Sequence, residues 1–120
     1  MVKAQKTWVK QYLLASAMIA LSWSIFACAQ AEEQRQGKEI LEKLCARCHA
    51  VGRTGSSPNK RAPPFRSFSE TKLYDSDFKQ RLETGLISIH PFMPTFRFST
   101  EEAGEVLSYM RSIQERRKPK

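Results

Sequence analysis

Two cysteines and one histidine have the residue types and the spacing that most directly indicate chemistry. They lie in the segment LCARCHA (44–50) as Cys45, Cys48 and His49. On a helix, residues at i, i+3 and i+4 share one face, so both thiols and the imidazole can point the same way. Two such thiols can form thioether bonds to the two vinyl groups of a haem, with the imidazole beneath the iron. C-x-x-C-H is the attachment signature of a c-type haem.

Other uses of these residues agree less well with the sequence. A thioredoxin-like dithiol should follow a strand in a βαβ pattern, whereas a helical pattern precedes this one. A structural zinc ion takes four ligands, and only Cys45, Cys48, His49 and His90 would be present after export. The neighbouring residues Cys48 and His49 could hardly reach one metal ion together. We therefore expect one covalent haem c, attached through Cys45 and Cys48 and with His49 on its iron.

The first thirty residues indicate the compartment. Three lysines precede the 16-residue apolar stretch YLLASAMIALSWSIFA (12–27). Two triplets that follow, Ala27-Cys28-Ala29 and Ala29-Gln30-Ala31, have the small-x-small form of a cleavage site. The order charged, apolar, small is that of a secretory signal peptide. We expect residues 1–29 to be a signal peptide that is cleaved after Ala29 or Ala31. The mature protein is then periplasmic and soluble.

Two alternatives to this cleavage are open. The N-terminal segment could stay as a membrane anchor, although its apolar stretch is shorter than the roughly 20 residues that span a bilayer. Alternatively, IFAC (25–28) loosely resembles a lipoprotein cleavage box, which would make Cys28 a lipid-bearing first residue. Phe26 fits that box poorly, so the lipid anchor is less expected than cleavage to a soluble protein.

Processing leaves a small and moderately basic domain. Cleavage after Ala29 leaves 120 − 29 = 91 residues, and loss of three lysines lowers the formal charge from +8 to +5. A chain of this size often needs a staple, a metal or a cofactor. Its positive charge suits redox partners with acidic docking surfaces. We expect it to meet a membrane only transiently or through a partner. The predicted exported domain covers residues 30–116, and a basic tail, 117–120, follows it. We expect no nucleic-acid partner for such a domain.

The segment ahead of the two cysteines has a helical pattern. From Glu32 to about Cys48, one face carries small or apolar residues at helical spacing: Gly37, Ile40, Leu41 and Leu44. The next stretch, 51–65, is rich in Gly, Ser and Pro and is predicted to be a long irregular loop. Such a loop is unusual in a small domain unless it wraps around something.

Further helices are predicted in the C-terminal half of the chain. Residues 69–75 form a short helical turn, and 75–85 form a helix that starts at Asp75 or Ser76 and ends at Gly85. The segment 86–98 holds two prolines and cannot be regular helix throughout.

A last helix is predicted to begin at Ser99 or Thr100 and to end near Arg116. Ser99 and Glu102 have the spacing of a capping box. An apolar stripe follows at helical spacing: Ala103, Val106, Leu107, Met110 and Ile113. No strand pair is convincing, so the fold class is all-α with much loop.

Together these segments resemble the class I, mitochondrial-type monohaem cytochromes c, as small exported bacterial proteins. The resemblance covers 32–116 and rests on CARCH (45–49) behind the first helix, APPF (62–65), HPFMPTF (90–96) and VLSYM (106–110). It implies a cytochrome c fold in which the N- and C-terminal helices cross. Short helices and a Pro-rich loop then wrap around one covalent haem. Leu41 stands where the family commonly has an aromatic residue.

The two sides of the iron are assigned as follows. APPF resembles the family's proline segment, whose carbonyl accepts a hydrogen bond from the proximal imidazole. A proline carbonyl in a loop also has no helical partner, so Pro63 or Pro64 is the expected acceptor for His49. Met93 is the expected sixth ligand, because it lies in a loop framed by prolines where no helical face explains it.

Two other residues could take the place of Met93. Met110 lies on the apolar stripe of the last helix, where methionine usually fills the core. His90 stays open as an alternative ligand at the edge of the same loop.

An iron that is closed on both sides favours electron transfer and leaves no catalytic site. The expected function is that of a periplasmic electron carrier, either a soluble shuttle or the electron-accepting subunit of a dehydrogenase or respiratory complex. The alternative is a haem c protein that binds or senses a gas through a displaceable sixth ligand. Four cations are predicted to surround the exposed haem edge: Lys60, Arg61, Arg66 and Arg97.

Overall fold

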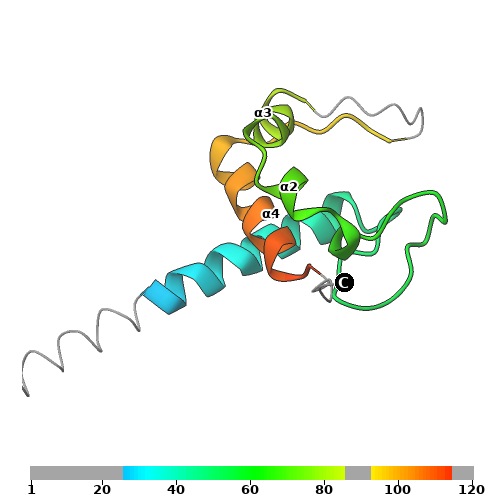
Figure 1. Ribbon diagram of the computed structural model, residues 1–120, viewed down its shortest axis with the longest axis horizontal. Coiled ribbons are helices and arrows are strands. Elements are labelled where there is room, and N and C mark those ends of the chain that lie inside the picture. Colours follow the sequence, from blue (N-terminus) through cyan, green and yellow to red (C-terminus); the bar gives the residue numbers. More distant parts are fainter. Residues whose placement is uncertain (1–25, 86–92, 115–120) are drawn as a thin grey trace, which may run out of the picture. The chain divides into compact units, whose positions relative to one another are not determined.

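The computed structural model describes residues 26–85 and 93–114, and it divides the chain into two compact units, 1–32 and 33–120. In the first unit, residues 26–32 are helical. The second unit begins with helical residues 33–44, here called the N-terminal helix. Four further elements follow in order: η1 (Phe65–Ser67), α2 (Glu70–Leu73), α3 (Ser76–Thr84) and α4 (Thr100–Ser112) (Figure 1). Over these two ranges no strand occurs, and the all-α fold class is confirmed.

The helix starts that were predicted from local sequence are present. The side chain of Asp75 accepts a hydrogen bond from the N–H of Asp77 at 3.0 Å and so caps α3. At α4, Ser99 Oγ accepts from the N–H of Glu102 at 3.1 Å, and the Glu102 carboxylate accepts from the N–H of Ser99 at 2.8 Å. These two bonds form the predicted capping box and satisfy two N–H groups that the helix itself leaves free.

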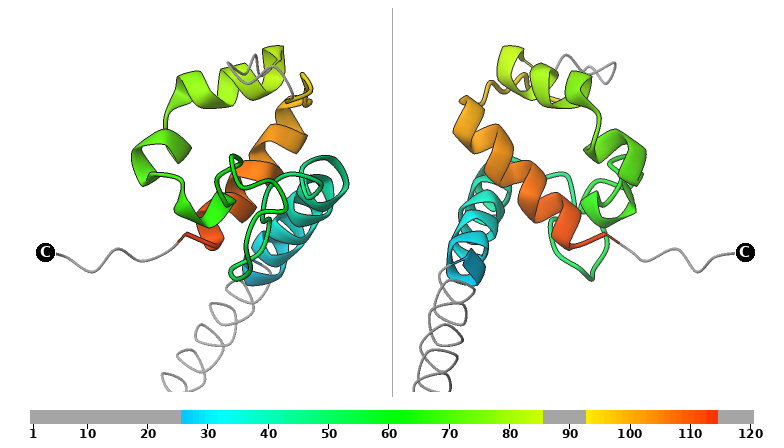
Figure 2. Two further views of the ribbon diagram at one scale, coloured as in Figure 1. Left: turned by 90° about the vertical axis from the view of Figure 1, so that its right-hand side faces the viewer. Right: turned by 60° about the vertical axis from the view of Figure 1, so that its left-hand side comes forward.

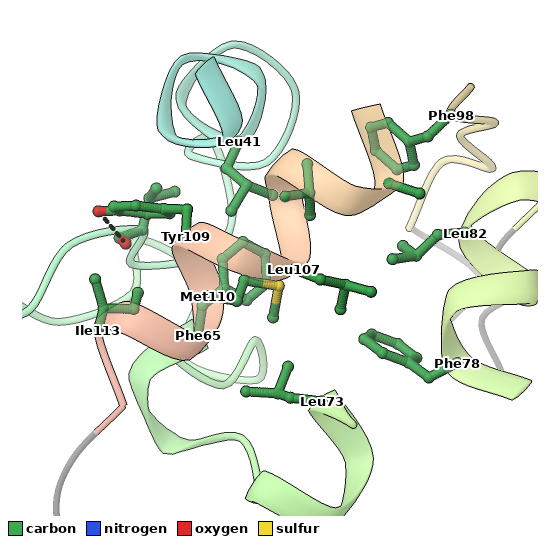
Figure 3. Packing of buried hydrophobic residues seen from close by; sticks show 13 residues of the cluster. Leu41, Phe65, Leu73, Phe78, Leu82, Phe98, Leu107, Tyr109, Met110 and Ile113 are labelled. Atoms are coloured by element: carbon green, nitrogen blue, oxygen red, sulfur yellow. Dashed lines mark hydrogen bonds between the residues drawn. The ribbon is translucent and has the colours of Figure 1, made fainter. Parts of the chain in front are cut away.

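The core lies around α4, which packs against η1, α2 and α3. Figure 3 shows Met110 and Leu107 of α4 among side chains from the other elements. The most deeply buried residues of this cluster are Leu41, Leu73, Ala103, Val106, Leu107, Met110 and Ile113. All five members of the predicted α4 stripe are buried. Met110 is 2% exposed and fills the core as predicted.

The N-terminal helix and α4 cross at a glycine. A Cβ atom on Gly37 would lie 2.0 Å from the carbonyl oxygen of Glu105 and 2.9 Å from the backbone nitrogen of Val106. These distances leave no room for a side chain, so the two backbones touch at this point. Two views show α4 running across the N-terminal helix (Figures 1 and 2). Leu41, one turn further on, is 2% exposed and packs into the core in place of the family's usual aromatic residue.

Two helices end earlier than the sequence predicts. The N-terminal helix ends at Leu44 instead of near Cys48, because the N–H groups of Cys45 and Ala46 both donate to the carbonyl of Leu41, at 2.8 and 3.1 Å. The regular i to i−4 ladder cannot continue past such a shared acceptor.

The last helix shows a similar early stop. It ends at Ser112 instead of near Arg116, a residue that lies outside the described ranges. Gln114 Nε2 donates to the carbonyl of Met110 at 2.6 Å. In a continuing helix the backbone N–H of Gln114 would occupy that carbonyl. The side chain of Gln114 therefore ends the helix, because it occupies the Met110 carbonyl that the next backbone N–H would use.

None of the helical residues described forms a stretch that combines the length and the apolar character needed to cross a membrane. The predicted cleavage sites at Ala29 and Ala31 lie just ahead of Glu33, where the second compact unit begins. The signal peptide itself stays a prediction, since most of residues 1–29 lie outside the described ranges.

Candidate haem site

The two cysteines and the histidine lie in one tight turn behind the N-terminal helix. The N–H groups of Cys48 and His49 both donate to the carbonyl of Cys45, at 3.1 and 2.9 Å. These are i to i−3 and i to i−4 bonds, so the turn keeps the spacing from which a shared face was predicted. All three side chains are half-buried, and both thiols are free.

Cys45 lacks the lowered pKa that the attacking thiol of a redox pair needs. Burial, assisted by the neighbouring Cys48, raises the pKa of Cys45 to about 11. A reactive dithiol needs the opposite shift, because the thiolate is the attacking species. Cys45 also packs against the edge of the hydrophobic core, as do Leu44 and Phe96. In the part of the chain that the structure describes, no group of three His, Cys, Asp or Glu residues is placed to hold a metal ion.

The imidazole of His49 is held by a backbone carbonyl. His49 Nδ1 lies 2.8 Å from the oxygen of Pro63. A carbonyl can only accept, so the proton of this hydrogen bond is on Nδ1 and the lone pair is on Nε2. That is the tautomer in which a histidine can bind a metal through Nε2.

This contact is one of the two that the sequence predicts, with Pro63 and not Pro64 as the acceptor. The carbonyl of Pro64 instead accepts from the N–H of Ser67 at 3.0 Å and from its hydroxyl at 2.7 Å. The carbonyl of Pro64 thus forms the first hydrogen bonds of the short η1 helix. The role of Pro63 toward a bound iron stays a prediction.

The Pro-rich loop folds back onto the turn at several points. The N–H of Asn59 donates to the carbonyl of Cys48 at 3.2 Å, and the N–H of Ala50 donates to Ser57 Oγ at 2.9 Å. The N–H of Phe65 then donates to the carbonyl of Ala50 at 3.1 Å. With the bond to Pro63, these contacts fix both neighbours of His49. Sequence reasoning missed Ser57 and Asn59, because each acts across a loop whose path no local pattern specifies.

An aromatic ring also lies against the imidazole. The rings of Phe65 and His49 are 4.7 Å apart between centroids, with an angle of 18° between their planes. Phe65 is 6% exposed, so it covers one face of the half-buried imidazole from inside the protein. The sequence placed Phe65 in the APPF segment but gave no sign of this stacking.

The expected sixth ligand lies at the edge of a described range. Met93 is half-buried and forms a bend ahead of the exposed residue Pro94. His90 and Pro91 lie outside the described ranges. The role of Met93 therefore stays a prediction, as does the alternative of His90.

These features fit a covalently attached haem. The turn offers two free, half-buried thiols at the required spacing, and the histidine beside them has its Nε2 lone pair available. Comparison with known proteins decides the family, because the sequence model described as Cytochrome c matches residues 34–114. The chain belongs to the cytochrome c family. Cytochrome c-552 of Bradyrhizobium diazoefficiens is 29% identical to it over 86 residues, which are 72% of this chain and 80% of that protein. No solved structure matches the chain significantly.

Membership of this family confirms the predicted resemblance to class I monohaem cytochromes c and the predicted haem c cofactor. This cytochrome c carries one covalent haem c and transfers electrons through it. The haem supplies an iron that gains and loses one electron. The residues that would hold it are Cys45 and Cys48, through thioether bonds, and His49, through Nε2. The chain itself holds that imidazole through the carbonyl of Pro63 and the ring of Phe65.

Covalent attachment through both cysteines gives the first testable prediction. Mature protein treated with acid and organic solvent should retain its haem, and its mass should equal the polypeptide plus one haem. A variant with both Cys45→Ala and Cys48→Ala should release all of its haem in the same extraction. Haem that leaves the parent protein freely would contradict the assignment. Each single variant is the control, since one remaining thioether bond still retains the group.

Proposed function

We propose that this cytochrome c is a periplasmic electron carrier with His49 and Met93 as the axial ligands of its iron. The hydrogen bond from His49 Nδ1 to Pro63 is the observation that supports this most directly. It leaves Nε2 for iron and holds the ring still while the charge of the metal changes. A methionine opposite histidine raises the reduction potential relative to two histidines.

The proposal includes export. The charged, apolar and small segments at the N-terminus are those of a signal peptide. The carrier acts either as a soluble shuttle or as the electron-accepting subunit of a dehydrogenase or respiratory complex. It has no catalytic site of its own.

An electron carrier differs from a gas-binding protein in having both axial positions of the iron occupied by the protein's own ligands. The mature ferrous protein should bind carbon monoxide slowly or not at all, while an outer-sphere oxidant should oxidise it rapidly and reversibly. Stopped-flow spectroscopy of both reactions on one preparation tests this. Rapid carbon monoxide binding by the parent protein would replace the carrier proposal with that of a gas-binding protein.

The partners proposed for this carrier are redox proteins with acidic docking surfaces. Residues 45–69 contain five Lys or Arg residues and no Asp or Glu. Four of these five cations are exposed: Arg47, Arg53, Lys60 and Arg61. Arg97 is exposed as well, whereas Arg66 is half-buried and less available for docking than the sequence predicted. The exposed cations of this acid-free segment would steer an anionic partner toward the haem.

Reversal of these charges should slow electron transfer to anions. The double variant Lys60→Glu, Arg61→Glu should react with hexacyanoferrate about tenfold more slowly at low ionic strength, because steering changes association rates by tenfold or more. The difference should vanish at high salt, where exposed charges are screened.

The control has the same charge change on α3. Lys79→Glu, Arg81→Glu alters a helix that carries acids of its own and lies apart from the loop (Figure 1). Equal slowing in both variants would mean that only net charge matters. An unchanged rate in the loop variant would leave these cations with a solubilising role.

A further inference from the structure

One hydrogen bond does not fix the orientation of a histidine ring. The bond from His49 Nδ1 to Pro63 sets a direction within the imidazole plane. The ring can still tilt about that direction, because the carbonyl accepts over a broad range of angles. A second contact across the face of the ring is required to fix the plane itself.

Phe65 supplies that second contact. Its ring lies nearly parallel to the imidazole, at 18° and 4.7 Å between centroids. A tilt of the imidazole would either collide with this ring or open a gap beside it. Gaps in a packed interior are costly, because the lining atoms lose their contacts. The stacked ring and the carbonyl thus constrain two different motions of His49.

Phe65 is itself held from several sides. Its N–H donates to Ala50 at 3.1 Å, and its carbonyl accepts from Gln114 Nε2 at 2.9 Å. Its ring meets the edge of Phe68, with 5.4 Å between centroids and 84° between planes. Figure 3 shows the ring within the core cluster that includes Met110 and Ile113. A ring that is fixed in this way can serve as a reference plane for its neighbour.

We propose that Phe65 is a positioning residue that sets the plane of the His49 imidazole above the haem. The inference rests on the proposed role of His49 as the proximal ligand. The orientation of an axial imidazole plane decides which iron d orbital overlaps with the ring, and so how unpaired spin spreads over the ferric haem. Phe65 therefore controls an electronic property of the cofactor without contact to the iron, as outer residues of metal sites do.

The test compares two phenylalanines that are almost equally buried. Phe65→Leu removes the planar ring and keeps much of its volume, and Phe78→Leu does the same in α3, where the ring is 5% exposed. Proton NMR of the ferric holoproteins should show a changed order of the four haem methyl resonances in Phe65→Leu. Phe78→Leu should keep the order of the parent, although its stability falls by a similar amount. Phe65→Tyr, which retains the ring plane, should also keep it.

The outcomes separate this inference from the proposed function. If Phe65→Leu keeps the methyl order of the parent and loses only stability, Phe65 is a packing residue and the inference is wrong. If the parent itself lacks the spectrum of histidine and methionine on low-spin iron, the proposed ligation fails instead.

A measurement on the parent protein applies if Phe65→Leu does not accumulate. Nuclear Overhauser contacts should connect the ring protons of Phe65 with those of the His49 imidazole. The plane derived from the methyl shifts should also lie parallel to the Phe65 ring. Absence of the contacts, or a crossed plane, overturns the inference.

Discussion

Met93→Ala should open the iron to external ligands and lower the reduction potential. The proposed bond between the Met93 sulfur and the iron is lost, and alanine has no atom that can replace the sulfur. The potential should fall on the order of 0.1 V or more, within the roughly 0.8 V range over which axial ligands set haem potentials. The ferrous variant should bind carbon monoxide rapidly. The weak long-wavelength band of sulfur on ferric iron should be lost.

The control for this variant is the other methionine of the domain. Met110 is 2% exposed in the core, and Met110→Leu keeps its volume. Such exchanges usually cost less than about 1.5 kcal/mol. Met110→Leu should therefore keep the spectrum, the potential and the closed iron of the parent. If Met93→Ala changes neither spectrum nor potential, His90 or an open site takes the place of Met93, and the gas-binding alternative gains support.

Gly37→Ala should be strongly destabilising for a change that adds a single methyl group. The new Cβ would lie 2.0 Å from the Glu105 oxygen and 2.4 Å from its carbonyl carbon, both of them backbone atoms that cannot rotate away. The N-terminal helix and α4 would have to separate. Overpacking of this kind costs about 3 kcal/mol or more, a large part of the 5–15 kcal/mol of a typical domain.

A second glycine provides a matched control for this change. Gly104 lies in α4 one residue before Glu105, and a Cβ added there would meet nothing within 4 Å. Gly104→Ala should stabilise the helix by about 0.5–1 kcal/mol, because alanine loses less chain entropy on folding. Denaturant unfolding of both holoproteins measures the two effects. A loss below about 0.5 kcal/mol for Gly37→Ala, the range of an ordinary surface change, would show that the helix crossing relaxes easily.

Local chemistry explains which parts of the fold were predictable. Asp75 caps α3 and Ser99 with Glu102 caps α4, because each bond joins residues two or three apart in the chain. The apolar stripe of α4 was predictable for the same reason, since its period alone defines the buried face. The helix ends were less predictable. The stop at Ser112 depends on a side chain that folds back from Gln114.

The site was predicted in its chemistry and only partly in its geometry. The spacing of Cys45, Cys48 and His49 carries the attachment chemistry, so these residues could be named directly. A loop proline was expected to hold the imidazole, but only the folded loop distinguishes Pro63 from Pro64. The stacking of Phe65 had no local signal, because it joins two segments 16 residues apart, 65 − 49. Contacts of this kind depend on the path of the whole loop.

The close contact at Gly37 also leads to an expectation about the order of events during folding. Gly37 and Glu105 are 105 − 37 = 68 residues apart, so this crossing is among the late-closing contacts of a chain that emerges from its N-terminus. Contacts between distant residues require a large loop to close before they gain any stability. Until α4 arrives, Leu41 and the turn behind it have no partner from the last helix. Cys45 packs against the edge of the same core, so we expect its thiol to be more accessible to chemical modification before the last helix has packed.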